Sequence, residues 1–238
     1  MQDAVLIALA LAALAGLSIP VGAWLGSREN LFPRWLEDEF RHTIIAFGGG
    51  ALLAAVALVL VPEGVRYVSP LTAMLAFCAG GAVFWLVDSA LERRGGHGAQ
   101  FMAMLLDYVP EAMALGALLS DATGVAVLMA GLIMVQNLPE GFNAYREMEG
   151  GKQRKRRSLF WLFVLVVPFG PLAAWLGVSV LASNTAVLGA IMLFAAGGIV
   201  YLLFEDVAPQ VRLERRWSPP LGAVAGFALG LAGSLATA

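Results

Sequence analysis

The sequence predicts an all-α membrane protein with eight transmembrane helices. Of its 238 residues, 60% are hydrophobic and only 13% are charged, and the mean hydropathy is +0.80. A soluble domain carries roughly 25% charged residues, so this composition indicates a polytopic membrane protein. The apolar residues fall in long runs, and the basic residues gather between alternate runs. These three observations predict the fold class and its orientation.

Eight apolar runs, each of about 20 residues, fill the chain as a single transmembrane domain, residues 1–238. The first run, residues 4–26, has no basic segment before it and is too long for the apolar part of a signal peptide, so we expect a retained helix. The others lie at residues 43–65, 70–91, 101–120, 122–147, 158–182, 185–207 and 219–237. Their connections are too short to contain a soluble domain.

The basic residues predict the orientation. All but one of the 15 Lys and Arg residues lie in or beside the odd-numbered connections, and Arg66 is the exception. By the positive-inside rule these connections are cytoplasmic and both termini are extracytoplasmic. The basic stretch at residues 150–157 fits a connection near anionic lipid better than a nucleic-acid patch. We therefore expect an integral protein of the cell (inner) membrane that contacts the lipid bilayer and no nucleic acid.

The second and seventh runs resemble each other. Each contains a glycine-rich segment followed by acidic residues and a proline, at residues 46–63 and 194–209. Because the two runs cross in opposite directions, helices 1–3 and 6–8 would form an inverted repeat around a central pair. This 3+2+3 plan is common among secondary transporters.

The central pair carries the least expected polar residues. Asp107 and Glu111 flank a proline in the fourth run, and Gln136 and Glu140 flank one in the fifth. Carboxylates and prolines destabilise apolar transmembrane helices, so their presence at matching positions in two helices indicates a function. Distances along the helices from the turn near residue 122, at 1.5 Å per residue, are about 22 Å for Asp107 and about 21 Å for Gln136. They are about 17 Å for Glu111 and about 27 Å for Glu140. The four side chains should converge in the inner half of the hydrocarbon layer.

The two prolines add backbone oxygens to this group. Pro110 cannot donate to the carbonyl of Leu106, nor Pro139 to that of Val135. Carboxylate, amide and freed carbonyl oxygens together suit a hard or borderline divalent cation. The sequence therefore predicts a metal site between helices four and five.

Further polar residues extend from this site. Asn143 and Glu147 continue the polar face of the fifth helix toward the cytoplasm, either as an exit path or as an ordinary helix end. Tyr108 follows Asp107, and we expect it to cap or narrow the site.

Acidic residues also lie at the ends of the repeat helices. Glu63 is at the outer end of the second helix, and Glu205 and Asp206 are at the inner end of the seventh. They are candidates for gates on the two sides of the membrane, or for ordinary interfacial carboxylates.

The last run presents Gly222, Gly226 and Gly230 on one helix face. Such a face favours close helix packing. Its partner is either a helix of the same chain or a second copy in a homodimer.

These features resemble the ZIP (Zrt/Irt-like) family of divalent metal transporters. The resemblance covers the whole chain and rests on eight helices, both termini outside, and two motifs: Asp-Tyr-Val-Pro-Glu at residues 107–111 and Gln-Asn-Leu-Pro-Glu-Gly at residues 136–141. It implies transport of zinc or a related ion toward the cytoplasm, with a transport unit that shifts against a scaffold. It also implies two groups of metal ligands: Asp107, Glu111, Gln136 and Glu140 in one site, and Asn137 with the two glutamates in a second.

The chain departs from the family motifs in its ligand types. The family usually has His-Asn where this chain has Asp107 and Tyr108, and often His or Gln followed by an acid where it has Gln136 and Asn137. A site without imidazole shifts preference from zinc toward manganese or iron(II), with zinc and cadmium still candidates. Tyr108 in place of an amide disfavours a second metal. The metal is cargo, and no cofactor is expected.

Two alternatives use the same carboxylates. An intramembrane enzyme could employ Asp107, Glu111 and Glu140 for acid–base chemistry, but no nucleophile motif, zinc-protease motif or nucleotide loop accompanies them. We therefore do not expect an enzyme. A proton-coupled carrier of another solute is the second alternative, since buried carboxylates also serve as proton relays.

Overall fold

The computed structural model describes residues 2–28, 34–93, 98–119, 122–150, 156–211 and 218–237. Within these ranges the chain is helical and has no strand. Eight helical spans are long and apolar enough to cross a membrane: Val5–Gly26, Glu39–Val65, Pro70–Leu91, Gln100–Leu118, Thr123–Gly150, Ser158–Leu181, Thr185–Val211 and Ser218–Thr237. The predicted all-α polytopic membrane fold is confirmed, and the spans follow the expected apolar runs with small shifts at their ends.

Five spans are single helices: α1 (Gln2–Gly26), α4 (Pro70–Glu92), α5 (Ala99–Leu118), α6 (Thr123–Gly150) and α11 (Ser218–Thr237). The other three contain a π-helical turn. They are α2 (Arg34–Ala55) with η1 (Val56–Leu60) and α3 (Val61–Val65); α7 (Arg156–Val166) with α8 (Phe169–Leu176) and η2 (Gly177–Leu181); and α9 (Thr185–Leu202) with η3 (Leu203–Val207) and α10 (Ala208–Val211).

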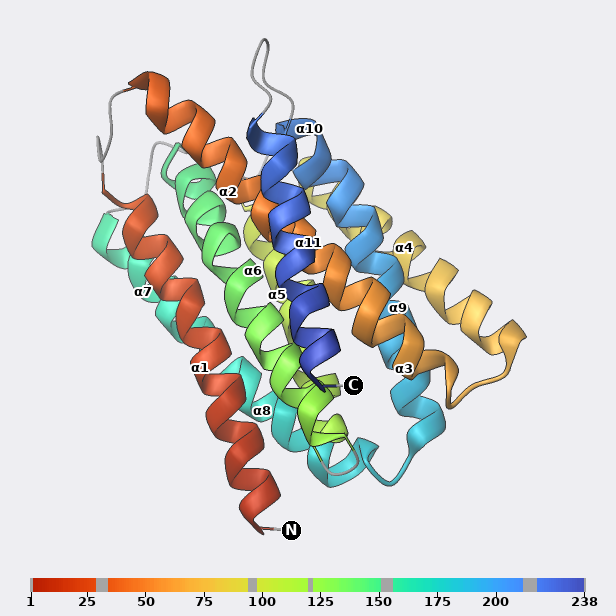
Figure 1. The fold of residues 1–238 in the computed structure, drawn as a ribbon. Helices are drawn as coiled ribbons and strands as arrows, with labels where there is room; N and C mark the ends of the chain where they lie inside the picture. Colours follow the sequence, from red (N-terminus) through yellow and green to blue (C-terminus); the bar gives the residue numbers. More distant parts are fainter. Residues whose placement is uncertain are drawn as a thin grey trace.

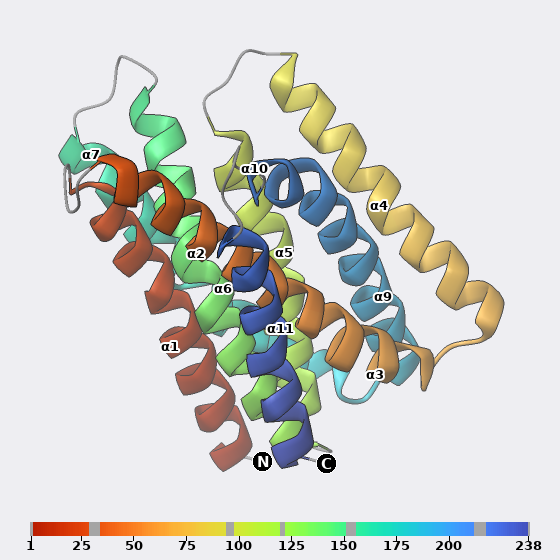
Figure 2. The ribbon, with the colours of Figure 1, turned by 45° about the horizontal axis from the view of Figure 1, so that its top comes forward.

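The helices α5 and α6 lie side by side in the middle of the bundle (Figure 1). On one side α1, α7 and α8 pack against them, and on the other side α2, α9 and α11 do so. Helix α4 packs mainly on α9 at the edge of the molecule (Figure 2). The N- and C-terminal ends lie at the same end of the bundle (Figure 2), as an even number of spans requires.

Prolines affect the helices differently according to their position. Pro110 and Pro139 lie inside the continuous helices α5 and α6, which transmembrane helices tolerate when neighbours occupy the freed backbone groups. In the sixth span, by contrast, α7 ends at Val166 and α8 begins after Pro168. Helix α4 begins at Pro70, where the hydroxyl of Ser69 accepts a hydrogen bond from the backbone N–H of Thr72 at 3.2 Å.

The second and seventh spans share a detail that the sequence alone did not show. Each contains a π turn, at Val56–Leu60 and Leu203–Val207, and a proline, Pro62 or Pro209, at the same distance from the start of that turn. The spans run in opposite directions in Figures 1 and 2. This match supports the predicted inverted repeat.

Glycines bring the helix backbones into direct contact. In α1 and α6 the contact is reciprocal: a Cβ at Gly22 would overlap the carbonyl oxygen of Leu138, and a Cβ at Gly141 would overlap that of Ile19. Comparable contacts join α4 to α9 and α5 to α8. Small residues allow this approach in membranes, where dispersion contacts stabilise helix pairs.

The glycine face of α11 has its partner within the chain. Gly222 and Gly226 lie against the carbonyl oxygens of Thr43 and Phe47, and Gly230 lies against Ala54, all in α2. The face is therefore filled by α2 and is not available to a second copy. A homodimer would need a different surface.

We expect Gly141→Ala to lower the free energy of unfolding by about 1–3 kcal/mol, the usual cost of overpacking. The reason is that the new methyl group would meet the rigid backbone of α1 at Ile19. Gly131→Ala in the same helix is the matched control, because nothing lies within 4 Å of a Cβ at that position. Thermal unfolding in detergent compares the two variants. Equal melting temperatures would contradict the proposed contact.

Candidate functional site

The predicted site residues lie on the central helix pair and are removed from solvent. Asp107 is 2% exposed, and Glu111, Gln136 and Asn137 are fully buried. Glu140 is partly buried. Polar groups buried at this depth in a membrane protein need partners or a function.

A direct contact joins the two motifs. The side-chain amide of Gln136 donates a hydrogen bond to Oε2 of Glu111 at 2.5 Å. The other oxygens of this group, Oε1 of Gln136, Oε1 of Glu111 and Oδ1 of Asp107, are buried and have no hydrogen-bond partner. Leaving such an acceptor unpaired costs about 1–3 kcal/mol, so these oxygens are available to a ligand that supplies positive charge.

Asp107 and Glu140 face a common cavity of about 50 Å³. This space exceeds the share of liquid volume of one water molecule, about 30 Å³, so it can hold a partly dehydrated ion. Its lining combines six polar and six apolar residues: Gln100, Asp107, Glu140, Asn143, Asp206 and Gln210 with Ile45, Leu52, Ala103, Met104, Leu202 and Val207. The cavity thus lies between the central pair and the ends of the second and seventh spans.

The carboxylates around this cavity interact with one another. Asp107 interacts electrostatically with both Glu111 and Glu140, and Glu140 also interacts with Asp206. Several negative groups in a low-dielectric region repel one another unless they share protons or a cation. This arrangement therefore favours either a shared proton or a bound cation.

No three His, Cys, Asp or Glu side chains within the described ranges are gathered closely enough to hold a metal ion by themselves. A cation bound between α5 and α6 would thus take amide or backbone oxygens as further ligands, or draw the carboxylates closer. The unpartnered Oε1 of Gln136 suits the first role.

A second, larger cavity of about 470 Å³ leads away from the site. We call it the outer cavity, because it lies farther from Asp107, and we call the cavity of about 50 Å³ beside Asp107 the inner cavity. The outer cavity shares three polar residues with the inner cavity, Gln100, Asn143 and Gln210. Arg41, Arg146 and Glu147 complete its lining. The two cavities together form a polar route from Asp107 toward the C-terminal end of α6.

Asn143 and Glu147 occupy different places on this route. Asn143 lines both cavities, and its Oδ1 is buried without a partner. Glu147 lines only the outer cavity, where its Oε2 accepts a hydrogen bond from the backbone N–H of Gln100 at 3.1 Å. Glu147 therefore also caps the first turn of α5, a structural role that the sequence did not indicate.

The acidic pair of the seventh span is divided by the structure. Asp206 lines the inner cavity, whereas the side chain of Glu205 is exposed. Adjacent residues of a helix point in directions about 100° apart, and here Glu205 turns away from the cavity. The structure thus places Asp206, and not Glu205, beside Glu140.

Glu63 lies outside the polar route. It is 5% exposed, and both its oxygens accept hydrogen bonds from Nη1 of Arg66, at 2.7 and 2.8 Å. This geometry is that of an ion pair at the end of a span, the interfacial alternative of the sequence prediction.

Of the five predicted metal ligands, Asp107 and Glu140 line the inner cavity, whereas Glu111, Gln136 and Asn137 do not. Tyr108 does not line it either. The prediction that Tyr108 caps the site is wrong, because its hydroxyl points to the carbonyl oxygens of Ala12 and Val167, at 3.3 and 3.5 Å. Its ring fills the space left by Gly16 and Gly170. Asn137 is buried with both amide atoms unpaired and lines neither cavity.

Sequence reasoning missed Gln100 and Gln210. Each lies whole helical turns away from a predicted site residue. Gln100 precedes Asp107 by two turns, and Gln210 follows Asp206 by one. Residues at these spacings share a helix face. Extending the polar face by whole turns from each acid could have identified both glutamines.

No protein-family model matches this chain, and a search of curated proteins finds no match. Functional inference therefore depends on the chemistry of the two cavities and of the buried oxygens beside them.

We expect Tyr108→Phe to lower the free energy of unfolding by about 1 kcal/mol, the net value of a typical hydrogen bond. The same variant should leave divalent-cation binding unchanged, because the hydroxyl contacts α1 and the α7–α8 link and not the cavity. Thermal unfolding and titration with Mn²⁺ measure the two effects separately. A changed affinity at unchanged stability would instead place Tyr108 in the site.

Proposed function

We propose that this protein carries divalent cations across a membrane through the inner cavity that α5 and α6 form with the second and seventh spans. The observation that carries the proposal is the set of buried, unpartnered oxygens of Asp107, Glu111 and Gln136 inside two membrane spans. Charged and amide groups are rarely placed at such a depth without a function in ion movement. The cation is cargo and not a resident cofactor.

The ligand chemistry favours hard and borderline ions. Among the described residues, the polar side chains that line the two cavities are Asp, Glu, Asn, Gln and Arg, without His or Cys. Oxygen donors suit Mn²⁺ and Fe²⁺, while Zn²⁺ and Cd²⁺ gain more from imidazole or thiolate. We therefore expect the transporter to prefer Mn²⁺ or Fe²⁺ and still to accept Zn²⁺ and Cd²⁺.

The polar route gives the proposed direction. From Asp107 and Glu140 it passes Asn143 and Asp206 and reaches the outer cavity, where Arg41 and Arg146 lie. Guanidinium groups repel a divalent cation, so this end favours release over binding. The basic connections predict that this end is cytoplasmic and that both termini lie outside a cell (inner) membrane. Transport would then run into the cell.

Membership of the ZIP family is part of the proposal. Its support is the set of eight spans, the two polar-polar-x-Pro-Glu motifs on neighbouring helices, and the shared π turn and proline of the second and seventh spans. The position of Tyr108 against α1 favours one metal site over two, because the second site of the family would need an amide at this position.

The prediction is that Glu111→Gln and Glu140→Gln each slow metal entry into liposomes at least about tenfold, since loss of a charged ligand removes about 1.5–3 kcal/mol. The assay uses purified protein, an entrapped metal-sensitive dye, and Mn²⁺, Fe²⁺, Zn²⁺, Cd²⁺ and Mg²⁺ in turn. Asp88→Asn is the matched control. Asp88 also lies in a span, but it accepts a hydrogen bond from the Tyr201 hydroxyl at 2.8 Å, away from the cavities.

The same vesicles separate the alternatives. A proton-coupled carrier of another solute would acidify an entrapped pH dye without moving any of the five metals, and an enzyme would move neither metals nor protons. If the wild type transports none of these ions, or if both glutamine variants match the wild type, the proposed transport function is wrong.

We expect Asp107→His to shift selectivity toward zinc, because it introduces the nitrogen ligand that Zn²⁺ favours. Competition between Zn²⁺ and Mn²⁺ during uptake measures the shift, which should be at least about tenfold for a change of one ligand type worth about 1.4 kcal/mol. Asp107→Asn is the control for loss of charge without a new nitrogen ligand. An unchanged competition ratio would show that Asp107 is not a ligand.

A further inference from the structure

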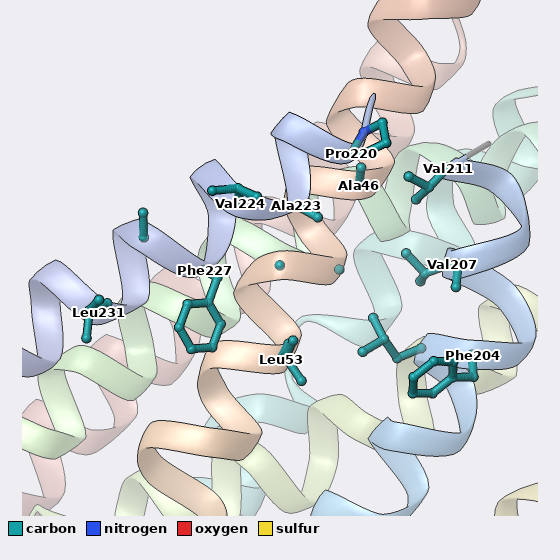
Figure 3. A pocket seen from close by; sticks show the side chains of 15 residues that line it. Ala46, Leu53, Phe204, Val207, Val211, Pro220, Ala223, Val224, Phe227 and Leu231 are labelled. Atoms are coloured by element: carbon teal, nitrogen blue, oxygen red, sulfur yellow. The ribbon is translucent and has the colours of Figure 1, made fainter. Parts of the chain in front are cut away.

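An apolar groove of about 680 Å³ lies on the opposite side of η3 from the polar cavity. Figure 3 shows its lining side chains: those of α11 lie on one side of α2, and those of η3 and α10 lie on the other. Every described residue that lines it is apolar, and these residues belong to three membrane spans. The groove is thus a lateral recess at the level of the hydrocarbon layer.

Small and large residues are arranged differently within this groove. Its floor includes Ala46, Gly49 and Gly50 of α2, which are fully or nearly fully buried. At its rim, Phe204 is 70% exposed and Val224 is 63% exposed. A smooth floor between large apolar rims suits a thin, flexible apolar occupant.

The length of the groove matches one leaflet of a bilayer. Along α11 it extends from Pro220 to Leu231, which is about 17 Å at 1.5 Å per residue. Half of the hydrocarbon thickness of a bilayer is about 15 Å. Pro220 is close to the start of its span at Ser218, so the groove runs from near the membrane boundary to somewhat beyond the midplane, since Leu231 is about 20 Å along the helix from Ser218.

The width of an acyl chain suits this groove, because it is set by carbon–carbon contact distances of about 4 Å. A tail of that width laid along about 17 Å of α11 takes up less space than the roughly 680 Å³ of the groove. The groove therefore has room for the tail of one lipid.

The sequence next to two of the groove residues favours an anionic lipid. Val211 and Pro220 line the groove and flank, in sequence, a connection that contains Arg212, Arg215 and Arg216. Basic segments beside membrane spans attract anionic headgroups. We infer that this groove binds the acyl tail of one anionic phospholipid from the leaflet that the positive-inside rule makes cytoplasmic.

Retention of lipid by the purified protein tests the inference. In native mass spectra of protein extracted from phosphatidylglycerol-containing membranes, wild type should carry one phospholipid. Ala223→Leu with Ala228→Leu fills the groove and should reduce that bound fraction at least about fivefold. The matched control, Ala186→Leu with Ala190→Leu, fills another apolar pocket of about 430 Å³ between α4 and α9 and should retain the lipid.

A second measurement uses unmodified protein, in case the filled variant does not fold. Phosphatidylglycerol with a diazirine at the end of its acyl chain is photolysed in vesicles, and labelled peptides are identified. Labelling of residues 203–211 and 220–231 should exceed that of the exposed face of α4, which includes Leu71 and Met74 at 70% and 65% exposure. Equal labelling of both regions, or equal lipid retention by both double variants, would overturn the inference.

Occupancy of the groove bears on the proposed function through Val207. This residue lines both the groove and the polar cavity, and Gly49 in α2 allows its side chain to approach. On the premise of cation transport, we expect the groove-filled variant, and not the control variant, to change the rate of metal uptake. If wild type moves no metal, lipid retention and labelling still test the lipid site by themselves.

Discussion

The central constraint on this structure is that charged and amide groups within a membrane must find partners inside the protein. The hydrogen bond from Gln136 to Glu111 answers this need on the central helix pair. It does so only in part, because Asp107 and Glu111 each keep an unpartnered buried oxygen. The hydrocarbon layer offers these oxygens no partner, so a partner has to come through the polar cavity or from a proton. The remaining helices hold the pair in place and separate it from lipid.

Glycine contacts provide that support. They bring α1 against α6 and α8 against α5, and in the same way α11 against α2 and α9 against α4. Each contact places a backbone carbonyl where a Cβ would otherwise lie, so the paired helices have little freedom to rotate. The consequence is that the polar faces of α5 and α6 keep a fixed orientation toward the second and seventh spans, where the cavity forms.

The sequence was sufficient to predict the spans and the level of the site. Two apolar helices joined by a short turn must be antiparallel, so equal distances from the turn predicted that Asp107 and Gln136 would lie level. The hydrogen bond of Gln136 goes instead to Glu111, one turn away from Asp107. The direction of side chains around each helix could not be predicted in the same way. Tyr108 follows Asp107 in sequence but faces α1, because which neighbour packs on each face of α5 depends on the whole bundle. Which of Glu205 and Asp206 faces the cavity likewise depends on how the neighbouring helices pack, and the sequence alone does not give that packing.

The π turn of the seventh span contains the acid that lines the polar cavity, Asp206. Such a turn inserts one residue into a helix and so rotates every later side chain by about 100° relative to an uninterrupted α-helix. The turn at Leu203–Val207 contains both Asp206 and Val207, one of which adds a carboxylate to the polar cavity while the other separates that cavity from the apolar groove. Conversion of this turn to a regular helix would move both residues together. One short segment thus supplies both the residue between the polar cavity and the apolar groove and the negative charge beside Glu140. The corresponding π turn of the second span contains no acidic residue.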